Sequence, residues 1–401
     1  MKYCRACSGE LFEQPLLTLD NMPASAQDIP DADGIKSDRG MTLSLCQCSR
    51  CGLVQFDCEP VSYYREVIRA GGFSTTMTEL RRRQYSHLIE TYGLAGRRFL
   101  EVGCGRGEFL SVLTEFPVQA CGIEYKDDLV KLAKEAGLEV WKDFAGSPGQ
   151  RISGGPYDVF LSFNFLEHQP DPSGMLGVIY DNLSEEGLGL ITVPSFEYIL
   201  EHNGYYELIR DHLAYYTFDS LEQLLNQNGF EVLEREMINR DTLSVIVRKA
   251  AVLKRQALYS QNSPLRLPAE RADVSGLLVS RDRIAEEINV CIAQLAEQKL
   301  SLAVWGASHQ GFTLAATTGL GEKVSYMIDS APFKQGLFAP ASHLPIVAPE
   351  YFETDPVDAV LIVAPGYTEE IAGIIRQRFV TADRPVRILT LRSDHLEYLE
   401  G

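Results

Sequence analysis

A short apolar run that ends in glycines, followed at once by a helical pattern, most constrains the fold of this chain. "RRFLEVGCG" begins at residue 97, and "EFLSVLTEF" continues with apolar residues at helical spacing. The alternation repeats in "VQACGIEY", "LVKLAKEAG", "GLEVWKDF", "YDVFLSFNFLEH" and "GLGLITVP". Strands that alternate with helices predict a mainly parallel sheet with helices on both faces. We therefore expect a doubly wound, Rossmann-like α/β unit over residues 85–250.

The glycine-rich turn after the first strand predicts a cofactor site. Gly103, Gly105 and Gly107 are spaced G-x-G-x-G, and such glycines let a ligand approach a helix N-terminus closely. A dinucleotide fold would show G-x-G-x-x-G instead. Glu101 precedes the glycines by two residues, where a carboxylate can hold a cationic methionyl amine through ordered water. A pyrophosphate would not need that carboxylate, so S-adenosylmethionine is favoured over a nicotinamide cofactor.

Residues at the ends of the later strands complete the expected cofactor site. Glu124 ends the second strand, where it can accept hydrogen bonds from both ribose hydroxyls. Asp143 and Phe144 follow the third strand, where the acid would take the adenine amine and the ring would pack alongside. This ensemble resembles the class I S-adenosylmethionine-dependent methyltransferases. In that superfamily the loop after the fourth strand, here starting at Asn164, passes near the methyl group, so Asn164 is a further expected contact.

Five of the nine cysteines lie in the first 51 residues. We expect a cytoplasmic protein, because no secretory signal follows Met1, and disulfides are disfavoured in that compartment. Two C-x-x-C pairs can direct four thiolates at one Zn²⁺ and so form a closed structural site. Cys46 is a competing ligand outside this register, and a set of free cysteines is the other alternative. We expect zinc on four sulfurs: Cys4, Cys7, Cys48 and Cys51.

A second α/β unit follows the first. "LSLAVWGAS", "KVSYMID", "VDAVLIVAP" and "VRILTL" read as strands, and "GFTLAATTGL" reads as a helix. Before them, "SRDRIAEEINVCIAQLAEQ" has the apolar stripe of an amphipathic helix. The expected parts are a zinc-binding module at 1–75, a methyltransferase core at 76–250, a helical connector at 251–300 and a C-terminal α/β substrate-binding domain at 301–401.

The charge and the hydrophobicity of the chain limit its partners. The net charge of −18 argues against nucleic acid, which needs clustered positive charge. We expect no membrane span, because no stretch approaches roughly 18 consecutive apolar residues. The basic run Arg81 to Arg83 is interpreted as a solvated helix face. The expected partner is a small molecule, and the expected state is a monomer or a weak dimer.

The order of the three parts narrows the function. A module ending in "CSRCGLVQ", a methyltransferase core, and a domain with "VWGASHQGFTL" and "YMIDSAPFKQGLFAPASHLPIVAP" together look like the sugar C-methyltransferases. That resemblance implies a nucleotide-linked 4-keto deoxysugar as substrate. A base would remove the proton from C3, and the resulting enolate would attack the sulfonium methyl. His309 and Lys334 lie in the last domain as candidate contacts to the diphosphate.

The resemblance also implies a catalytic cluster. Its members are a histidine on the loop after the fourth strand, here His168, and the last residue of a Tyr-x-Glu-His motif, here His212. An imidazole can deprotonate a carbon beside a ketone if the enolate is stabilised. A structural role in a turn is the alternative for His212. Simple proximity to the site is the alternative for His168.

The motif departs from the family at two positions. Ile209 replaces the tyrosine, and Asp211 keeps a carboxylate with a shorter reach than glutamate. Tyr215, or its neighbour Tyr216, is a candidate source of the lost hydroxyl. Phe73 stands where the family often has tyrosines. These departures leave room for an O- or N-methyltransferase, which needs one base and no enolate stabilisation. A cofactor-binding protein without activity is disfavoured, because the cofactor residues are intact.

Overall fold

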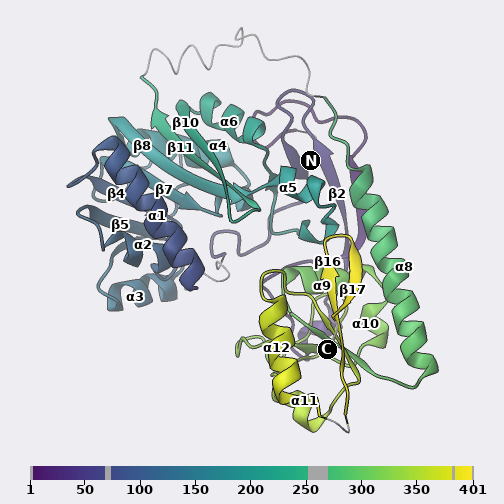
Figure 1. Cartoon of the computed structure of the whole chain (residues 1–401). Coiled ribbons are helices and arrows are strands. Elements are labelled where there is room, and N and C mark those ends of the chain that lie inside the picture. Colours follow the sequence, from purple (N-terminus) through teal and green to yellow (C-terminus); the bar gives the residue numbers. More distant parts are fainter. Residues whose placement is uncertain (1–2, 68–73, 252–269, 382–383, 400–401) are drawn as a thin grey trace.

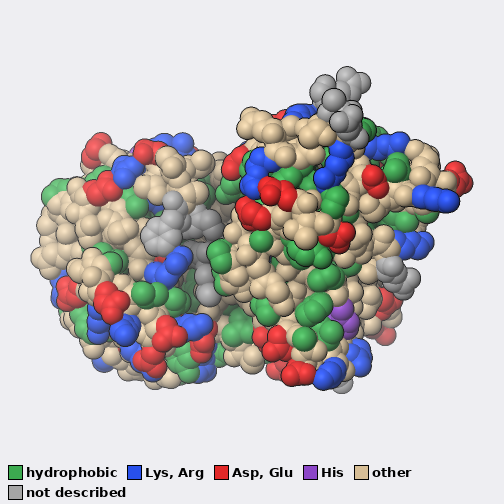
Figure 2. Space-filling model, turned by 90° about the horizontal axis from the view of Figure 1, so that it is seen from below, with side chains coloured by type: hydrophobic (Ala, Val, Ile, Leu, Met, Phe, Trp, Pro, Cys, Tyr) green, Lys and Arg blue, Asp and Glu red, His purple; other side chains and the backbone are tan. Residues whose placement is uncertain are grey.

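The computed structural model describes residues 3–67, 74–251, 270–381 and 384–399. The expectation for Phe73 and part of the expected connector, 252–269, lie outside these residues. Figure 1 shows the methyltransferase core as one body and the C-terminal domain as another, with the sheet of the N-terminal module beside the long helix α8. Seen from below, two lobes are separated by a furrow, and acidic and basic side chains are interspersed on this face (Figure 2).

The methyltransferase core confirms the expected doubly wound sheet. Its seven strands have the order β10-β11-β8-β7-β4-β5-β6, and β6, β5, β4, β7 and β8 run parallel. Their bounds are β4 Arg98–Val102, β5 Gln119–Glu124, β6 Glu139–Lys142, β7 Tyr157–Phe163, β8 Leu183–Pro194, β10 Phe230–Ile238 and β11 Thr242–Lys249.

Helices cover both faces of this sheet, because each has an apolar stripe to bury. One core holds side chains of α1, α2 and α3, and a second holds those of α4 and α6. The helices are α1 Thr75–Tyr92, α2 Glu108–Leu113, α3 Asp127–Glu135, α4 Pro172–Asn182, α5 Phe196–Glu201 and α6 Phe218–Gln227. Among the described residues, no helix is long and apolar enough to cross a membrane.

The interpretation of the basic run in α1 was wrong for one residue. Arg81 is only 1% exposed, and its guanidinium lies over the rings of Phe163 and Phe109, at 3.9 and 4.6 Å from their centroids. Arg82 and Arg83 do face outward and pair with surface glutamates. One arginine in three is buried here because its position on α1 faces the aromatic core, where cation–π contacts offset part of its desolvation.

The N-terminal module contains a four-stranded sheet with the order β1-β2-β3-β9. Its strands are β1 Leu17–Met22, β2 Met41–Gln47, β3 Val54–Phe56 and β9 Ala214–Tyr215, and a 3-10 helix, η1, spans Gly34–Lys36. The strand β9 belongs to the histidine motif, and it pairs antiparallel with β3 through Val54 and Tyr215. The module is therefore completed by a segment from far along the chain.

The C-terminal domain has a second Rossmann-like sheet, with the order β14-β13-β12-β15-β16-β17. All its pairs are parallel except β16 with β17. The strands are β12 Leu302–Trp305, β13 Met327–Ile328, β14 Ile346–Val347, β15 Ala359–Ile362, β16 Arg387–Arg392 and β17 His395–Leu399. The helices are α8 Ser275–Glu297, as expected from its apolar stripe, α9 His309–Thr317, α10 Leu320–Lys323, α11 Tyr351–Thr354 and α12 Thr368–Arg378.

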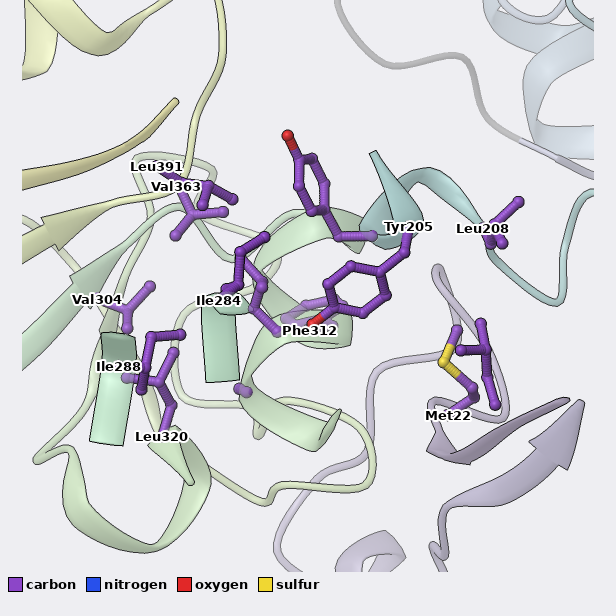
Figure 3. Close-up of a cluster of buried hydrophobic side chains, with 14 of the residues drawn as sticks. Met22, Tyr205, Leu208, Ile284, Ile288, Val304, Phe312, Leu320, Val363 and Leu391 are labelled. Carbon is purple, nitrogen blue, oxygen red and sulfur yellow. The ribbon is translucent and has the colours of Figure 1, made fainter. Parts of the chain in front are cut away.

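One hydrophobic core joins the module to the C-terminal domain. It includes Met22 of β1, Tyr205 before β9, Ile284 of α8 and Phe312 of α9, all at most 1% exposed. Figure 3 shows these side chains coming from separate elements into one cluster. Hydrogen bonds reinforce this contact: Asn21 donates to the Ala316 carbonyl, and Asp38 accepts from the Ala341 backbone N–H and interacts with His343. The module and the C-terminal domain thus pack as a unit.

Candidate active site

The expected cofactor residues lie together at the carboxyl ends of the parallel strands. This edge, where the strand order reverses between β4 and β7, is where open α/β sheets bind ligands. Gly103 and Gly107 have φ of 69° and 86°, a region that favours glycine. A Cβ on Gly103 would come within 3.0 Å of the Phe165 ring. The turn is therefore held tight against the loop that follows β7.

Glu101 and Glu124 are the acids of this edge. Glu101 is fully buried at the end of β4, and Glu124 is 4% exposed at the end of β5. The Glu124 carboxylate accepts hydrogen bonds from the backbone N–H groups of Gly105 and Lys126, at 3.0 and 2.9 Å. Each carboxylate oxygen has a second lone pair, so the two ribose hydroxyls expected there have acceptors. The same carboxylate also fixes the glycine turn against β5.

The adenine side of the site is aromatic. Asp143 accepts from the Phe144 backbone N–H at 2.8 Å and from the Gln150 amide at 2.6 Å. The Phe144 ring meets the Phe165 ring edge to face at 6.3 Å. The ring of Tyr64, from the N-terminal module, packs on Phe144 in the same manner at 6.0 Å. The module therefore contributes to this side of the site. The sequence did not predict this contact, because Tyr64 and Phe144 lie far apart in the chain.

Asn164 begins the loop after β7 in a left-handed conformation, with φ of 46°. Its side-chain oxygen accepts a hydrogen bond from the Thr192 hydroxyl at 3.0 Å, and its backbone N–H donates to the Thr192 carbonyl. These contacts tie the loop to β8. Asparagine tolerates this backbone region better than most residues. The turn between β7 and His168 therefore has a fixed conformation.

The two expected catalytic histidines are neighbours. His168 lies in a 3-10 helix, η2 (Leu166–His168), and His212 precedes β9. Their rings meet edge to face with centroids 4.8 Å apart. Burial lowers the pKa of His168, and burial together with the nearby His168 and His309 lowers the pKa of His212 well below its usual value. Both imidazoles are therefore neutral near pH 7, which is the state a general base requires.

Asp211 is held by the N-terminal module rather than by a histidine ring. Its carboxylate accepts from the Tyr63 hydroxyl at 2.6 Å and from the Ala26 backbone N–H at 2.9 Å. Its main-chain carbonyl accepts from His168 Nδ1 at 2.7 Å. The residue is 2% exposed. No sequence signal predicted Tyr63 as its partner, because the two lie 148 positions apart.

Tyr215 braces the turn that carries His212. Its hydroxyl accepts from the Ile209 backbone N–H at 2.8 Å and donates to the Ile209 carbonyl at 3.1 Å. Both backbone groups of Ile209 are thus bound by a buried side chain six residues later. This hydroxyl does not reach toward a substrate in this arrangement, and Tyr216 is likewise fully buried.

A small pocket with room for about one water molecule lies next to Ile209. It is lined by three parts of the molecule: the segment after β1, the residues before His212 and the start of α9. His309 lines it, and Nε2 of His309 lies 3.2 Å from a Glu207 carboxylate oxygen. Lys334 lies between β13 and β14, and its ammonium donates to Asp329 and to the carbonyl of Ala307, which lies between β12 and α9, at 3.0 and 2.9 Å.

The four cysteines of the expected metal site meet in the N-terminal module. Every pair of their sulfurs lies within 4.8 Å. The Sγ atoms of Cys4 and Cys51 are 3.5 Å apart, and so are those of Cys7 and Cys48. Backbone N–H groups of neighbouring residues point at Cys4, Cys7 and Cys48. Cys46 is outside the cluster, and its thiol is directed at the Ser44 carbonyl.

Comparisons with known proteins agree with this architecture. Residues 77–235 match the methyltransferase domain family, and residues 279–383 match the C-methyltransferase C-terminal domain family. The first match spans the glycine turn, the strand-end acids and both histidines. The second covers most of α8 and the C-terminal sheet. The first match covers most of the seven-stranded sheet, and the second begins ahead of the six-stranded sheet.

Individual relatives match different shares of the chain. The C-methyltransferase NovU of Streptomyces niveus is 23% identical over 92% of this chain and 90% of its own length. A ubiquinone biosynthesis O-methyltransferase of Bordetella parapertussis is 36% identical, but over only 22% of this chain and 39% of its own. The structure of magnesium protoporphyrin IX methyltransferase from Synechocystis PCC 6803 covers 47% of this chain and 91% of its own, with 13% identity and a TM-score of 0.36. This chain is a methyltransferase with a class I core, and it is similar over most of its length to a C-methyltransferase.

Proposed function

We propose that this enzyme methylates the carbon beside a ketone on a nucleotide-linked deoxysugar, with His212 as the general base. The observation that carries the proposal is the pair of neutral imidazoles, His168 and His212, at 4.8 Å beside the cofactor edge of the sheet. A neutral, partly exposed imidazole can accept the proton of such a carbon. The likeness to a C-methyltransferase over most of the chain supports carbon as the acceptor.

The residues present fit S-adenosylmethionine. When bound, it supplies an electrophilic methyl group on a sulfonium. Glu101 would bind the methionyl amine, and Glu124 would bind the ribose hydroxyls. The glycine turn would let the cofactor approach the protein backbone closely. His212 would hold the proton taken from the substrate carbon, and Tyr215 would hold His212 in place through Ile209. The furrow between the two lobes would admit the sugar.

We also propose a structural zinc ion on Cys4, Cys7, Cys48 and Cys51. A tetrahedral site with Zn–S bonds of about 2.3 Å places its sulfurs about 3.8 Å apart. The separations of 3.5 Å for two pairs, and at most 4.8 Å for all, are close to that requirement. The four thiolates would leave no open position, so the ion would stabilise the fold and take no part in methyl transfer.

Product analysis tests the acceptor. We would incubate the enzyme with S-adenosylmethionine carrying a ¹³C methyl group and a panel of nucleotide-linked 4-keto and hydroxy sugars. A ¹³C methyl resonance on carbon is the expected result. Without the methyl donor, solvent deuterium should enter the position beside the ketone. His212→Ala should lower turnover about 100-fold or more, while binding of S-adenosylhomocysteine should stay unchanged. A loss below about threefold would exclude His212 as the base.

O- or N-methylation is the second candidate. Ile209 has no hydroxyl, and the Tyr215 hydroxyl is bound to the backbone, so neither side chain polarises a ketone in this arrangement. A base alone suffices to methylate a hydroxyl or an amine. A ¹³C methyl resonance on oxygen or nitrogen, with no deuterium incorporation beside a ketone, would establish this function instead.

A further inference from the structure

Glu167 is a buried acid in the histidine cluster that the family motif does not assign. It precedes His168 in η2 and is 1% exposed. Its Oε1 lies 3.8 Å from His168 Nε2. One ligand-type atom from each of Glu167, His168 and His212 falls within 4.8 Å of the others. A carboxylate at this separation interacts strongly with a protonated imidazole, because the site is shielded from water.

The hydrogen bonding of His168 determines where it carries a proton. A main-chain carbonyl can only accept, so Nδ1, at 2.7 Å from the Asp211 carbonyl, bears a hydrogen. Any second proton on this ring must therefore sit on Nε2, and Nε2 is the atom that faces Glu167. An imidazolium at His168 would form an ion pair with that carboxylate.

The acid of the histidine motif is engaged elsewhere. The Asp211 carboxylate accepts from Tyr63 and Ala26 of the N-terminal module. It ties the module to the catalytic turn, and the structure gives it no hydrogen bond to a histidine ring. A protonated His212 nevertheless needs a counter-charge, because a buried cation without one is costly. The Glu167 carboxylate lies within 4.8 Å of a ring nitrogen of each histidine.

We propose that Glu167 supplies the counter-charge for the protonated histidine pair, in the role that the motif position 211 would otherwise fill. Glu167 is a positioning and charge-balancing residue, and it does not touch the substrate. During turnover the proton leaves the substrate carbon with its electron pair remaining on that carbon, and it is held on His212. It then passes to solvent. Glu167 stays ionised throughout, so no other reactant is needed. This inference rests on the proposed base role of His212.

Other groups around the pair act on the same charge. His309 approaches His212 from α9 and disfavours its protonation. Asp211 favours protonation of His168, while the ring of Tyr215 packs on His212 at 6.1 Å. Tyr216 lies near Glu167, whose charge helps to raise the pKa of that phenol. Among the described residues, Glu167 is the acid that faces both rings from η2.

Titration of the histidines by NMR tests the inference without any substrate. The chain has seven histidines, and the His212 and His168 signals would be assigned from His212→Asn and His168→Asn. In the full-length protein, Glu167→Gln should lower the titration midpoints of His168 and His212 by about one pH unit or more, because an opposite charge within about 4–6 Å shifts a pKa by 1–3 units. Asp211→Asn should shift the His212 midpoint less.

Kinetics give a second readout on any substrate that is turned over. The acidic limb of kcat/KM should move to lower pH in Glu167→Gln, and the plateau should fall about tenfold, with KM for S-adenosylmethionine unchanged. If Glu167→Gln does not fold, Glu167→Asp moves the charge away by about one methylene and should shift both midpoints in the same direction by less. Unchanged midpoints in a folded variant would overturn the proposal. So would a divalent ion bound by the three side chains, seen as a second metal equivalent per chain.

Failure of the proposed function would look different. If no nucleotide sugar accepts a methyl group on carbon but the NMR midpoints shift, the charge pairing stands and the substrate assignment fails. If carbon methylation occurs and the midpoints do not shift, the proposed function stands and the role of Glu167 is refuted.

Discussion

At the scale of a single residue, His212 must accept a proton in a place where its charged form is disfavoured. A base must accept a proton, yet burial and a neighbouring imidazole disfavour the charged form. The site thus keeps the ring neutral at rest and relies on local charge to stabilise it once protonated. This arrangement prevents the resting enzyme from losing its base as the pH falls below 7.

The lowered pKa values have a consequence for stability. Unfolded, His168 and His212 would titrate near the ordinary value of 6.5, whereas folded they titrate below it. As the pH falls through 6.5, the unfolded chain therefore binds more protons than the folded one. Stability should be fully present above 6.5 and decline as the pH falls toward the folded pKa values, by about 1.4 kcal/mol per pH unit for each histidine.

His212→Asn should remove part of this decline. Thermal unfolding measured between pH 7.5 and 5.5 would give a smaller loss of Tm in the variant than in the wild-type enzyme. His202→Asn is the matched control, because His202 follows α5 and stacks on the Tyr198 ring rather than on the His168–His212 pair. Equal pH dependence in wild type and His212→Asn would show that His212 is not held neutral by folding.

The Tyr215 hydroxyl holds the backbone before His212 in place. Tyr215→Phe leaves the ring in place and removes the hydrogen bonds to both backbone groups of Ile209. We expect a loss of about 1–3 kcal/mol in unfolding free energy and a fall in kcat, because the turn before His212 loosens. Tyr205→Phe is the control: its buried hydroxyl bonds Thr317 at 3.0 Å, away from the histidines, so stability should fall while kcat stays within about twofold.

The residues that sequence reasoning placed correctly are those whose position follows from local structure. Glu101, Glu124 and Asp143 sit at ends of parallel strands, and parallel strands end at one edge of a sheet. Tyr63 and Ala26 could not be found this way, because their contacts with Asp211 arise only when the module packs on the core. Long-range packing leaves no periodic pattern in the chain.

At the scale of elements, the same distinction holds. The strands of both α/β units were predictable because each is an apolar run with a turn signal at its end. The strand β9 was not, since its two residues become a strand only by pairing with β3. The cysteine pairs lie between these cases: their spacing predicted a cluster, and the 40 residues between them are spanned by β1, β2 and the loops around them.

Metal analysis of single-cysteine variants tests the zinc module. The purified enzyme should contain one zinc per chain. Cys51→Ser should lose it, and the unfolding temperature should drop, because structural zinc binding contributes directly to folding. Cys46→Ser is a matched control at a buried cysteine outside the cluster, and it should keep the metal. Equal zinc content in Cys51→Ser and wild type would rule out the proposed ligand set.

At the scale of the whole molecule, the N-terminal module connects the methyltransferase core to the C-terminal domain. Its cysteine cluster packs in the same core as α4 and α6 of the methyltransferase sheet. Its β-sheet packs in a different core, with α8 and α9 of the C-terminal domain. The histidine motif runs between these two cores and adds β9 to the module. The distance between the cofactor edge and the C-terminal domain therefore depends on how the N-terminal module packs.

The module packs against one face of the C-terminal sheet. A substitution in the core on that face should therefore affect the proposed zinc site, and a substitution in the core on the other face should not. Phe312, in the shared core, and Ile375, in the core on the other face of the C-terminal sheet, are both at most 1% exposed. Replacing either with alanine should cost about 2–5 kcal/mol. Phe312→Ala should speed zinc loss to a chromophoric chelator several-fold, because β1 packs on α9, while Ile375→Ala should leave that rate near the wild-type value. Equal rates in the two variants would mean that the module and the C-terminal domain are not coupled through their common core.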